Sequence, residues 1–134
     1  MKRSPLKPSQ TPLRRTAIGQ TRKESAKNEA RFQRRVTDLA QALGWWPFHM
    51  YNAARSPAGW PDLVLFRERI IFAELKAPDA RGKMGGLRPA QIEMAHRCFK
   101  AGAEHYVWHD GDEDDWREIE DVLSRGGIVK VKRG

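Results

Sequence analysis

Two short apolar segments near the middle of the chain are separated by a polar turn of hairpin size. Residues 59–66 (GWPDLVLF) and 70–76 (IIFAELK) are rich in β-branched and aromatic side chains, which favour strands. Residues 67–69 (RER) are polar enough to form the turn between them. The sequence therefore predicts a β-hairpin around which the rest of the chain is organised.

Three charged residues lie in this predicted hairpin. Side chains alternate between the two faces of a strand, so Glu74 and Lys76 share a face, and antiparallel pairing brings Asp62 close to them. Unpaired charge among apolar side chains is strongly unfavourable. One interpretation is an exposed ion pair between Glu74 and Lys76, with Asp62 capping the turn after Pro61. The other is a bound divalent cation, because carboxylate oxygens suit such cations and a nearby lysine can steady a hydroxide or a phosphate.

The same residues belong to a spaced pattern along the chain. The pattern consists of Gly59, Pro61, Asp62, Glu74, Leu75 and Lys76, with Glu29 upstream and Gln91 downstream. It resembles the PD-(D/E)xK nuclease superfamily and, more narrowly, the VRR-NUC (virus-type replication-repair nuclease) family. The resemblance extends from about residue 29 to about residue 108, and it includes four spaced elements that match in order.

The predicted elements around the hairpin agree with this resemblance. Periodicity and capping residues predict helices from Ser25 or Asn28 to about Leu43, over 89–101 and from Asp112, and strands at about 48–53, 103–109 and 128–132. The fold class is therefore α/β, in the order αβββαβ followed by a C-terminal helix and strand. The resemblance implies a restriction-endonuclease-like core, which is a mixed sheet flanked by helices.

The resemblance also implies a site for Mg²⁺ or Mn²⁺. Oxygen ligands suit both of these hard cations. Glu29 would join the hairpin ligands directly or through water; from the residues alone, it could instead favour the positive N-terminal end of its helix. Lys76 would position the attacking water or stabilise charge on the phosphate. The implied metal ligands are Glu29, Asp62, Glu74 and Leu75 through its main-chain carbonyl, and the implied catalytic residues are Asp62, Glu74, Lys76 and Gln91.

The helix predicted over residues 89–101 is expected to bury one face. Gln91, Met94, Cys98 and Phe99 fall on that face at helical spacing, and Gln91 lies at its N-terminal end. A glutamine in this position can hydrogen-bond a water, a phosphate or an active-site carboxylate.

Two loops supply candidate contacts to nucleic acid. Arg55 and Ser56 lie in a glycine-containing loop before the hairpin, where they contact phosphate or simply form an exposed loop. Residues 77–88 form a glycine-rich basic loop that we expect to be flexible and to follow a DNA backbone. Lys83 and Arg88 are its candidate phosphate contacts.

Two further polar features favour structural roles. A lone histidine at the start of a strand, such as His49, is more often structural than catalytic. The consecutive carboxylates at residues 112–115 favour the positive end of a helix and point in different directions, so we do not expect a metal site there.

The N-terminal residues differ in composition from the rest of the chain. The chain has 134 residues and a net charge of +8, and residues 1–27 alone hold eight basic residues against one acidic residue. Because this segment cannot build a core, residues 1–24 are predicted to be a disordered basic tail that solubilises the protein or attracts nucleic acid. Residues 25–134 are predicted to form one nuclease-like domain. A single cysteine, Cys98, excludes an internal disulfide or cysteine-based zinc site.

The sequence favours an intracellular location. No apolar run is long enough to span a membrane, and the N-terminus lacks the apolar core of a signal peptide. We therefore expect a cytoplasmic protein without a membrane partner; if phage-encoded, it would act in the cytoplasm of the host.

The resemblance implies DNA endonuclease activity. Small stand-alone members resemble homodimeric resolvases that cut branched DNA such as a four-way (Holliday) junction. The expected function is therefore metal-dependent, structure-directed hydrolysis of phosphodiester bonds, with branched DNA and a second copy of the chain as partners. Two alternatives stay open: a restriction-like or degradative nuclease with little structure preference, and a non-catalytic DNA-binding module whose carboxylates are structural.

Overall fold

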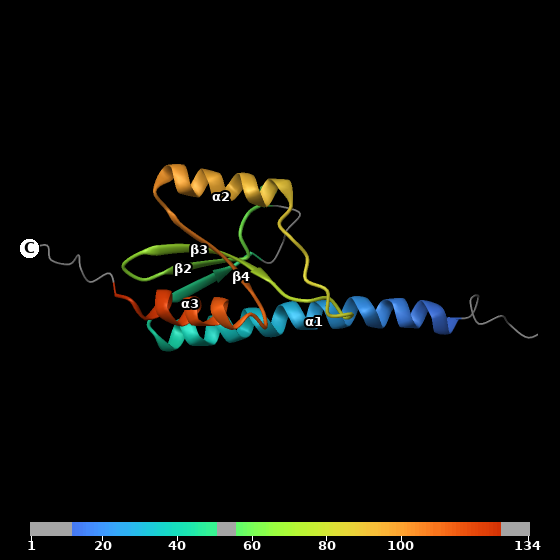
Figure 1. Ribbon diagram of the computed structural model, residues 1–134. Helices are drawn as coiled ribbons and strands as arrows, with labels where there is room; N and C mark the ends of the chain where they lie inside the picture. The colour runs from blue at the N-terminus through green and yellow to red at the C-terminus, as the bar shows by residue number, and fades with distance from the viewer. Residues whose placement is uncertain (1–11, 51–55, 127–134) are drawn as a thin grey trace, which may run out of the picture.

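A four-stranded mixed sheet forms the centre of the protein. The computed structural model describes residues 12–50 and 56–126, with side chains described from residue 21 onward. The strands are β1 (Trp46–His49), β2 (Leu63–Phe66), β3 (Ile70–Lys76) and β4 (Glu104–His109), and the helices are α1 (Pro12–Ala42), α2 (Pro89–Ala101) and α3 (Glu113–Ser124). Strands β1, β2 and β3 pair antiparallel in that order, and β4 lies parallel to β3 (Figure 1). The predicted α/β class and the predicted hairpin are confirmed.

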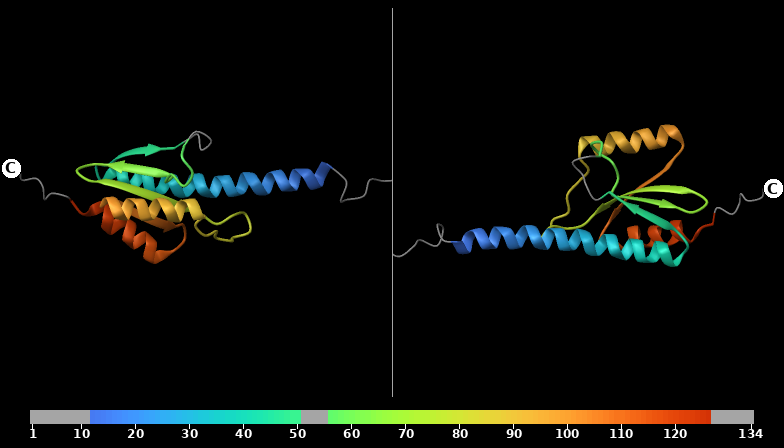
Figure 2. Two further views of the ribbon diagram at one scale, coloured as in Figure 1. Left: turned by 90° about the horizontal axis from the view of Figure 1, so that it is seen from above. Right: turned by 180° about the vertical axis from the view of Figure 1, so that it is seen from behind.

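The helices lie on both faces of the sheet. α1 and α3 lie against one face, and α2 lies over the other (Figures 1 and 2). The main core is on the side of α1 and α3, where alternate strand residues point towards both helices. Its buried members are Phe32, Val36, Ala40, Trp45, Leu63, Leu65, Ile71, Ala73, Trp108, Ile119, Val122 and Leu123. None of the helices in the described part of the chain has the length and apolar composition needed to span a bilayer.

The β2–β3 turn holds the C-terminal ends of α1 and α3. The guanidinium of Arg67 donates to the carbonyl of Leu43 at 2.9 Å and to that of Leu123 at 3.3 Å. The Cζ atom of Arg67 also lies 4.4 Å from the centre of the Trp45 ring, close enough for a cation–π interaction. Arg69 donates to the carbonyl of Val122 at 3.1 Å. Carbonyls that helix ends leave unpaired thus receive donors from the hairpin.

The first helix begins well before its predicted start at Ser25. α1 starts at Pro12 and contains 31 residues, so residues 12–24 are helical and the prediction of a disordered tail is wrong for them. The prediction depended on apolar residues that could pack, and the first buried residue among the described side chains of α1, which start at residue 21, is Phe32. The helix is instead supported locally, because proline suits a first helical position and arginine, lysine, alanine and glutamine have high helix propensity.

Residues 78–83 are more ordered than the predicted flexible loop. The Asn28 side chain donates to the carbonyl of Pro78 at 2.9 Å, and the Ala80 amide donates to Ser25 Oγ at 3.1 Å. Asp79 Oδ1 also accepts hydrogen bonds from two amides of the same turn, at residues 81 and 83. These contacts attach the loop to α1, which corrects the prediction of flexibility for this part of it.

Other predicted elements need smaller corrections. The strand expected at about 48–53 is observed as Trp46–His49, and residues 51–55 lie outside the described part of the chain, as does the strand expected at 128–132. Phe99 was expected on the buried face of α2, but it is 83% exposed, whereas Cys98 is buried. A single helix packing on one side of a sheet buries a narrow stripe, and Phe99 lies beyond its edge.

Candidate active site

Asp62 is held at the start of β2 by the backbone of β3. The Leu75 amide donates to Asp62 Oδ2 at 2.8 Å. Leu63 pairs with Ala73 in the antiparallel register, so Asp62 lies opposite Glu74. The hairpin therefore places the two carboxylates at the same level of the sheet, as the sequence predicted.

Glu74 is buried and connected to Lys76 through a glutamine from α2. Only 4% of Glu74 is exposed. Gln91 Nε2 donates to Glu74 Oε2 at 2.8 Å, and Lys76 Nζ donates to Gln91 Oε1 at 3.1 Å. Lys76 Nζ also lies 3.7 Å from Glu74 Oε2. Gln91 thus fixes the relative positions of an acidic and a basic side chain on the same strand face.

The electrostatics of the site favour an added positive charge. Burial, followed by the neighbouring charge of Asp62, raises the pKa of Glu74 to about 8, although Lys76 acts in the opposite direction. One lysine therefore does not compensate two adjacent carboxylates. A divalent cation between them would, and two carboxylates with a main-chain carbonyl at Leu75 are the oxygen donors that Mg²⁺ and Mn²⁺ prefer. The residues present fit such an ion.

The loop before Asp62 packs closely against the N-terminus of α2. Gly59 has a φ of +83°, and a Cβ atom at this position would lie 2.2 Å from the carbonyl oxygen of Ala90. Only glycine accommodates both the backbone conformation and the close approach. This contact sets the distance between the loop that carries Asp62 and the helix turn that carries Gln91.

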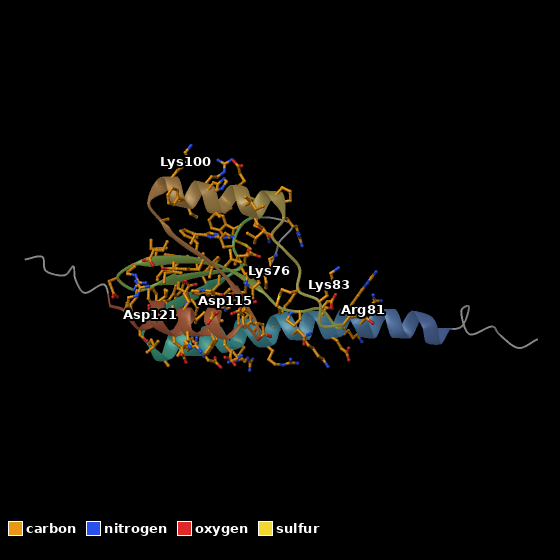
Figure 3. The ribbon with its side chains drawn as sticks, in the orientation of Figure 1. Lys76, Arg81, Lys83, Lys100, Asp115 and Asp121 are labelled. Atoms are coloured by element: carbon orange, nitrogen blue, oxygen red, sulfur yellow. The ribbon has the colours of Figure 1, made fainter. Side chains whose placement is uncertain are left out.

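A cavity of about 760 Å³ opens beside these groups, between α1, the hairpin and the N-terminus of α2. Every predicted site residue that the structure describes lines this cavity. These are Glu29, Ser56, Asp62, Glu74, Leu75, Lys76, Lys83, Arg88 and Gln91. Arg55 lies outside the described residues. Lys76 and Lys83 are labelled in Figure 3, where Lys76 lies at the sheet and Lys83 lies on the loop beside α1.

Glu29 lines the cavity, but it is more exposed to solvent than Asp62 and Glu74. Its side chain is exposed, whereas Glu74 is buried. Within residues 12–50 and 56–126, no three carboxylate, imidazole or thiol groups gather closely enough to hold an ion. Asp62 and Glu74 therefore form the acidic centre, and Glu29 lines the same cavity.

α1 contributes more residues to the cavity than the sequence indicated. Ser25 and Gln33 line it, and Asp79 reaches it from the loop attached to α1. Gln33 lies one helical turn after Glu29, and its side chain contacts His49. Nothing in the sequence indicates the contact of Ser25 with Ala80, because the two residues are far apart along the chain.

The two remaining polar features have structural roles. His49 contacts Gln33 and lies 3.5 Å from Thr37 Oγ1, and burial lowers its pKa, which favours the neutral form. In the acidic run, Asp112 caps α3 by accepting from the Asp115 amide at 3.0 Å. Asp115 in turn accepts from the His109 amide at 2.7 Å. These contacts agree with the structural interpretation of both features.

Comparison with known proteins supports the family that the motifs indicated. No family model matches the sequence, and no curated protein matches it. The structure is similar to a solved VRR_NUC domain, with a TM-score of 0.54 and 27% sequence identity over 69% of this chain and 95% of that chain. The fold is α/β, with a four-stranded mixed sheet and three helices in the described residues. The structural match supports the assignment of this chain to the VRR-NUC family and indicates a nuclease domain.

Proposed function

We propose that the protein is a metal-dependent DNA endonuclease that hydrolyses phosphodiester bonds in the cavity between α1, the β2–β3 hairpin and α2. The observation that carries this proposal is the arrangement of Asp62 beside buried Glu74, with Lys76 linked to Glu74 through Gln91. A site with two adjacent carboxylates and one lysine suits a divalent cation, and the bound cation together with the lysine would suit a phosphate.

Asp62, Glu74 and the carbonyl of Leu75 would hold Mg²⁺ or Mn²⁺, with Glu29 acting through water. The bound ion would polarise the phosphate and lower the pKa of a coordinated water. Lys76 projects its ammonium group beside this centre, where it would orient the attacking water or stabilise the charge that develops on the phosphate. Gln91 would act as a positioning residue, because its amide hydrogen-bonds both Glu74 and Lys76.

DNA is the proposed substrate, and branched DNA the preferred form. Ser56, Lys83 and Arg88 line the cavity, where hydroxyl, ammonium and guanidinium groups can bind phosphates, and Arg55 belongs to the same proposed set. Such contacts position a backbone without reading base sequence, which fits recognition of structure rather than sequence. The proposed setting is the cytoplasm, where an intracellular nuclease meets its DNA.

A homodimer is part of this proposal. The sheet face beside α2 exposes an aromatic patch, in which Trp46 is 64% exposed and Phe66 is 38% exposed, with ring centres 5.8 Å apart. Ile70 pairs with Phe66 and is 48% exposed on the same face. An exposed apolar patch of this kind suits burial by a second copy, and two copies would supply the two active sites needed to cut two strands.

Cleavage of a synthetic four-way junction, measured on gels with Mg²⁺, with Mn²⁺ and with chelator, tests the proposal. We expect cleavage only with metal, and faster cleavage of the junction than of linear or flapped DNA of the same sequence. Equal rates on all three substrates would favour a degradative nuclease. Binding without cleavage under every condition would favour a non-catalytic DNA-binding module.

A further inference from the structure

The N-terminal part of α1 projects beyond the sheet. We name residues 12–27 the arm. Figures 1 and 2 show that the arm continues the axis of α1 past the end of the domain. None of the described side chains of α1 before Phe32 is buried, and the loop contacts at Ser25 and Asn28 are its attachment to the domain. A helix that buries so little apolar surface gains little from packing, which suggests that another molecule lies along it.

The arm is basic. Its sequence contains five basic residues and one acidic residue, Glu24. Arg22, Lys23 and Lys27 are exposed, and none of them forms an ion pair with another described side chain. Positive charge without acidic partners is the electrostatic pattern expected of a surface that binds phosphates.

Positive charge continues from the arm to the active site. The loop that contains Arg81 and Lys83 is attached to α1 by the hydrogen bond between the Ala80 amide and Ser25. Both basic side chains are exposed. Figure 3 shows Lys76, Lys83 and Arg81 in succession from the sheet towards the projecting part of α1. The loop thus connects the cavity, where Lys83 is part of the wall, with the base of the arm.

We infer that the arm binds the phosphate backbone of the duplex that flanks the scissile phosphate. This inference rests on the nuclease function proposed above and extends its substrate contacts beyond the cavity. From Ser25 to Pro12 the helix is about 20 Å long at about 1.5 Å per residue. At about 3.4 Å per base pair this length corresponds to about six base pairs of duplex beyond the loop.

The composition of the arm favours nucleic acid over a membrane surface. A helix that lies on a bilayer needs a broad apolar face, usually with aromatic residues. The arm sequence has no aromatic residue, and Leu13 and Ile18 are its only large aliphatic residues. Phosphate binding requires only exposed positive charge, which Arg22, Lys23 and Lys27 supply.

A charge-removal experiment on the full-length protein tests the inference. The arm variant carries Arg22→Gln, Lys23→Gln and Lys27→Gln, because glutamine preserves helix propensity. The matched control carries Arg97→Gln, Lys100→Gln and Arg117→Gln, which remove the same charge from exposed positions on α2 and α3. Circular dichroism of both variants verifies that helix content is preserved. Binding is measured by fluorescence anisotropy in chelator, so that no cleavage occurs, on duplex flanks of increasing length.

We expect wild-type affinity to rise as the flank grows to about six base pairs beyond the loop contact and then to level off. The arm variant should bind long flanks at least about tenfold more weakly, and the slope of log affinity against log salt should fall by about two to three. Duplexes without a flank beyond the loop contact should show the smallest difference between the two proteins, and the control variant should match wild type throughout.

Equal affinity of the arm variant and wild type for every flank would overturn the inference. It would also be overturned if wild type bound anionic phosphatidylserine vesicles more strongly than duplex and the arm variant lost that vesicle binding. The outcomes also separate the two proposals. If wild type cleaves DNA and the arm variant binds every flank as well as wild type, the inference about the arm is rejected and the nuclease proposal stands. If affinity depends on flank length but no DNA is cleaved, the inference about the arm is supported and the nuclease proposal is rejected. Failure of wild type to bind any DNA rejects both.

Discussion

The side-chain amide of Gln91, at the first turn of α2, donates a hydrogen bond of 2.8 Å to the buried carboxylate of Glu74 on β3. The other end of the same amide accepts from Lys76 at 3.1 Å and from the Arg88 backbone at 2.8 Å. The acidic and basic groups of the site therefore depend on one helix terminus for their relative position.

Replacement of Gln91 should slow cleavage without a large change in DNA affinity. Gln91→Ala removes the group that aligns Glu74 with Lys76, and loss of such a supporting contact typically lowers activity about 10- to 100-fold. Single-turnover cleavage and anisotropy separate the two effects. His96→Ala on the exposed side of the same helix is the control, and a similar loss of activity in both variants would contradict the role given to Gln91.

The charge of Asp62 should matter more than its hydrogen bond. Asp62→Asn keeps an oxygen that can accept from the Leu75 amide, so the fold should be preserved, but it removes one of the two carboxylate charges. We expect cleavage to fall at least about 100-fold, with DNA binding retained. Titration calorimetry with Mn²⁺ should show weaker metal binding. Cleavage at the wild-type rate would remove Asp62 from the proposed site.

Stability in the absence of metal should depend on pH through Glu74. Its pKa is raised to about 8 in the folded protein from a usual value of 4.5, so between these values the folded chain holds a proton that the unfolded chain has lost. This stabilisation is complete below about pH 4.5 and is lost as the pH rises towards about 8. Burial lowers the pKa of His49 and His105, which acts in the opposite direction as the pH rises through 6.5.

Comparison of wild type with Glu74→Gln isolates the contribution of the carboxyl group. Melting temperatures measured in chelator from pH 5 to pH 9 should fall more steeply for wild type than for the variant. Mg²⁺ should reduce the difference at high pH, because a bound cation stabilises the ionised form. Parallel curves for the two proteins would mean that Glu74 titrates normally.

Gly59 and Gly82 offer a matched pair of substitutions. Both have a φ of +83°, but a Cβ at Gly59 would lie 2.2 Å from the Ala90 carbonyl oxygen, whereas a Cβ at Gly82 meets no atom within 4 Å. Gly82→Ala should cost about 1–2 kcal/mol of unfolding free energy from backbone strain alone. Gly59→Ala should cost more and should also slow cleavage, because α2 must move away from the hairpin. Equal costs in denaturant titrations would show that the close contact is unimportant.

The aromatic patch predicts where two copies meet. Phe66→Ser should shift the protein from dimer to monomer in analytical ultracentrifugation, because it removes the centre of the exposed face shared with Trp46 and Ile70. Phe99→Ser on α2 is the control, since it removes an exposed aromatic ring outside the patch. A wild-type protein that sediments as a monomer would exclude the homodimer.

Local sequence patterns predicted the elements that hold the candidate site residues. β3 and α2 have the predicted bounds, Ile70–Lys76 and Pro89–Ala101, because alternation, a proline at the helix start and a glycine after its end are signals within a few residues. The pairing of Asp62 with Glu74 followed from the hairpin. The motif spacing also identified Gln91, whose contact with Glu74 no local pattern could show.

The features that the sequence did not reveal depend on contacts between distant residues or on weak local preferences. The attachment of the loop at Pro78 to Asn28 requires the folded positions of two segments. The early start of α1 at Pro12 agrees with the helix propensity of its residues, which a search for apolar periodicity does not detect. Phe99 follows the apolar period of α2, but the helix buries too narrow a stripe to cover it.

The division of the sheet into two faces has a consequence for how this protein can diversify. The main core lies with α1 and α3, whereas Glu74, the single buried charged residue in the described part of the chain, lies on the face towards α2. Substitutions around the cavity therefore leave most of the packing untouched. Under the proposed function, substitutions in the loops and α2 would change the DNA preference, while the packing that stabilises the fold lies on the opposite side of the sheet.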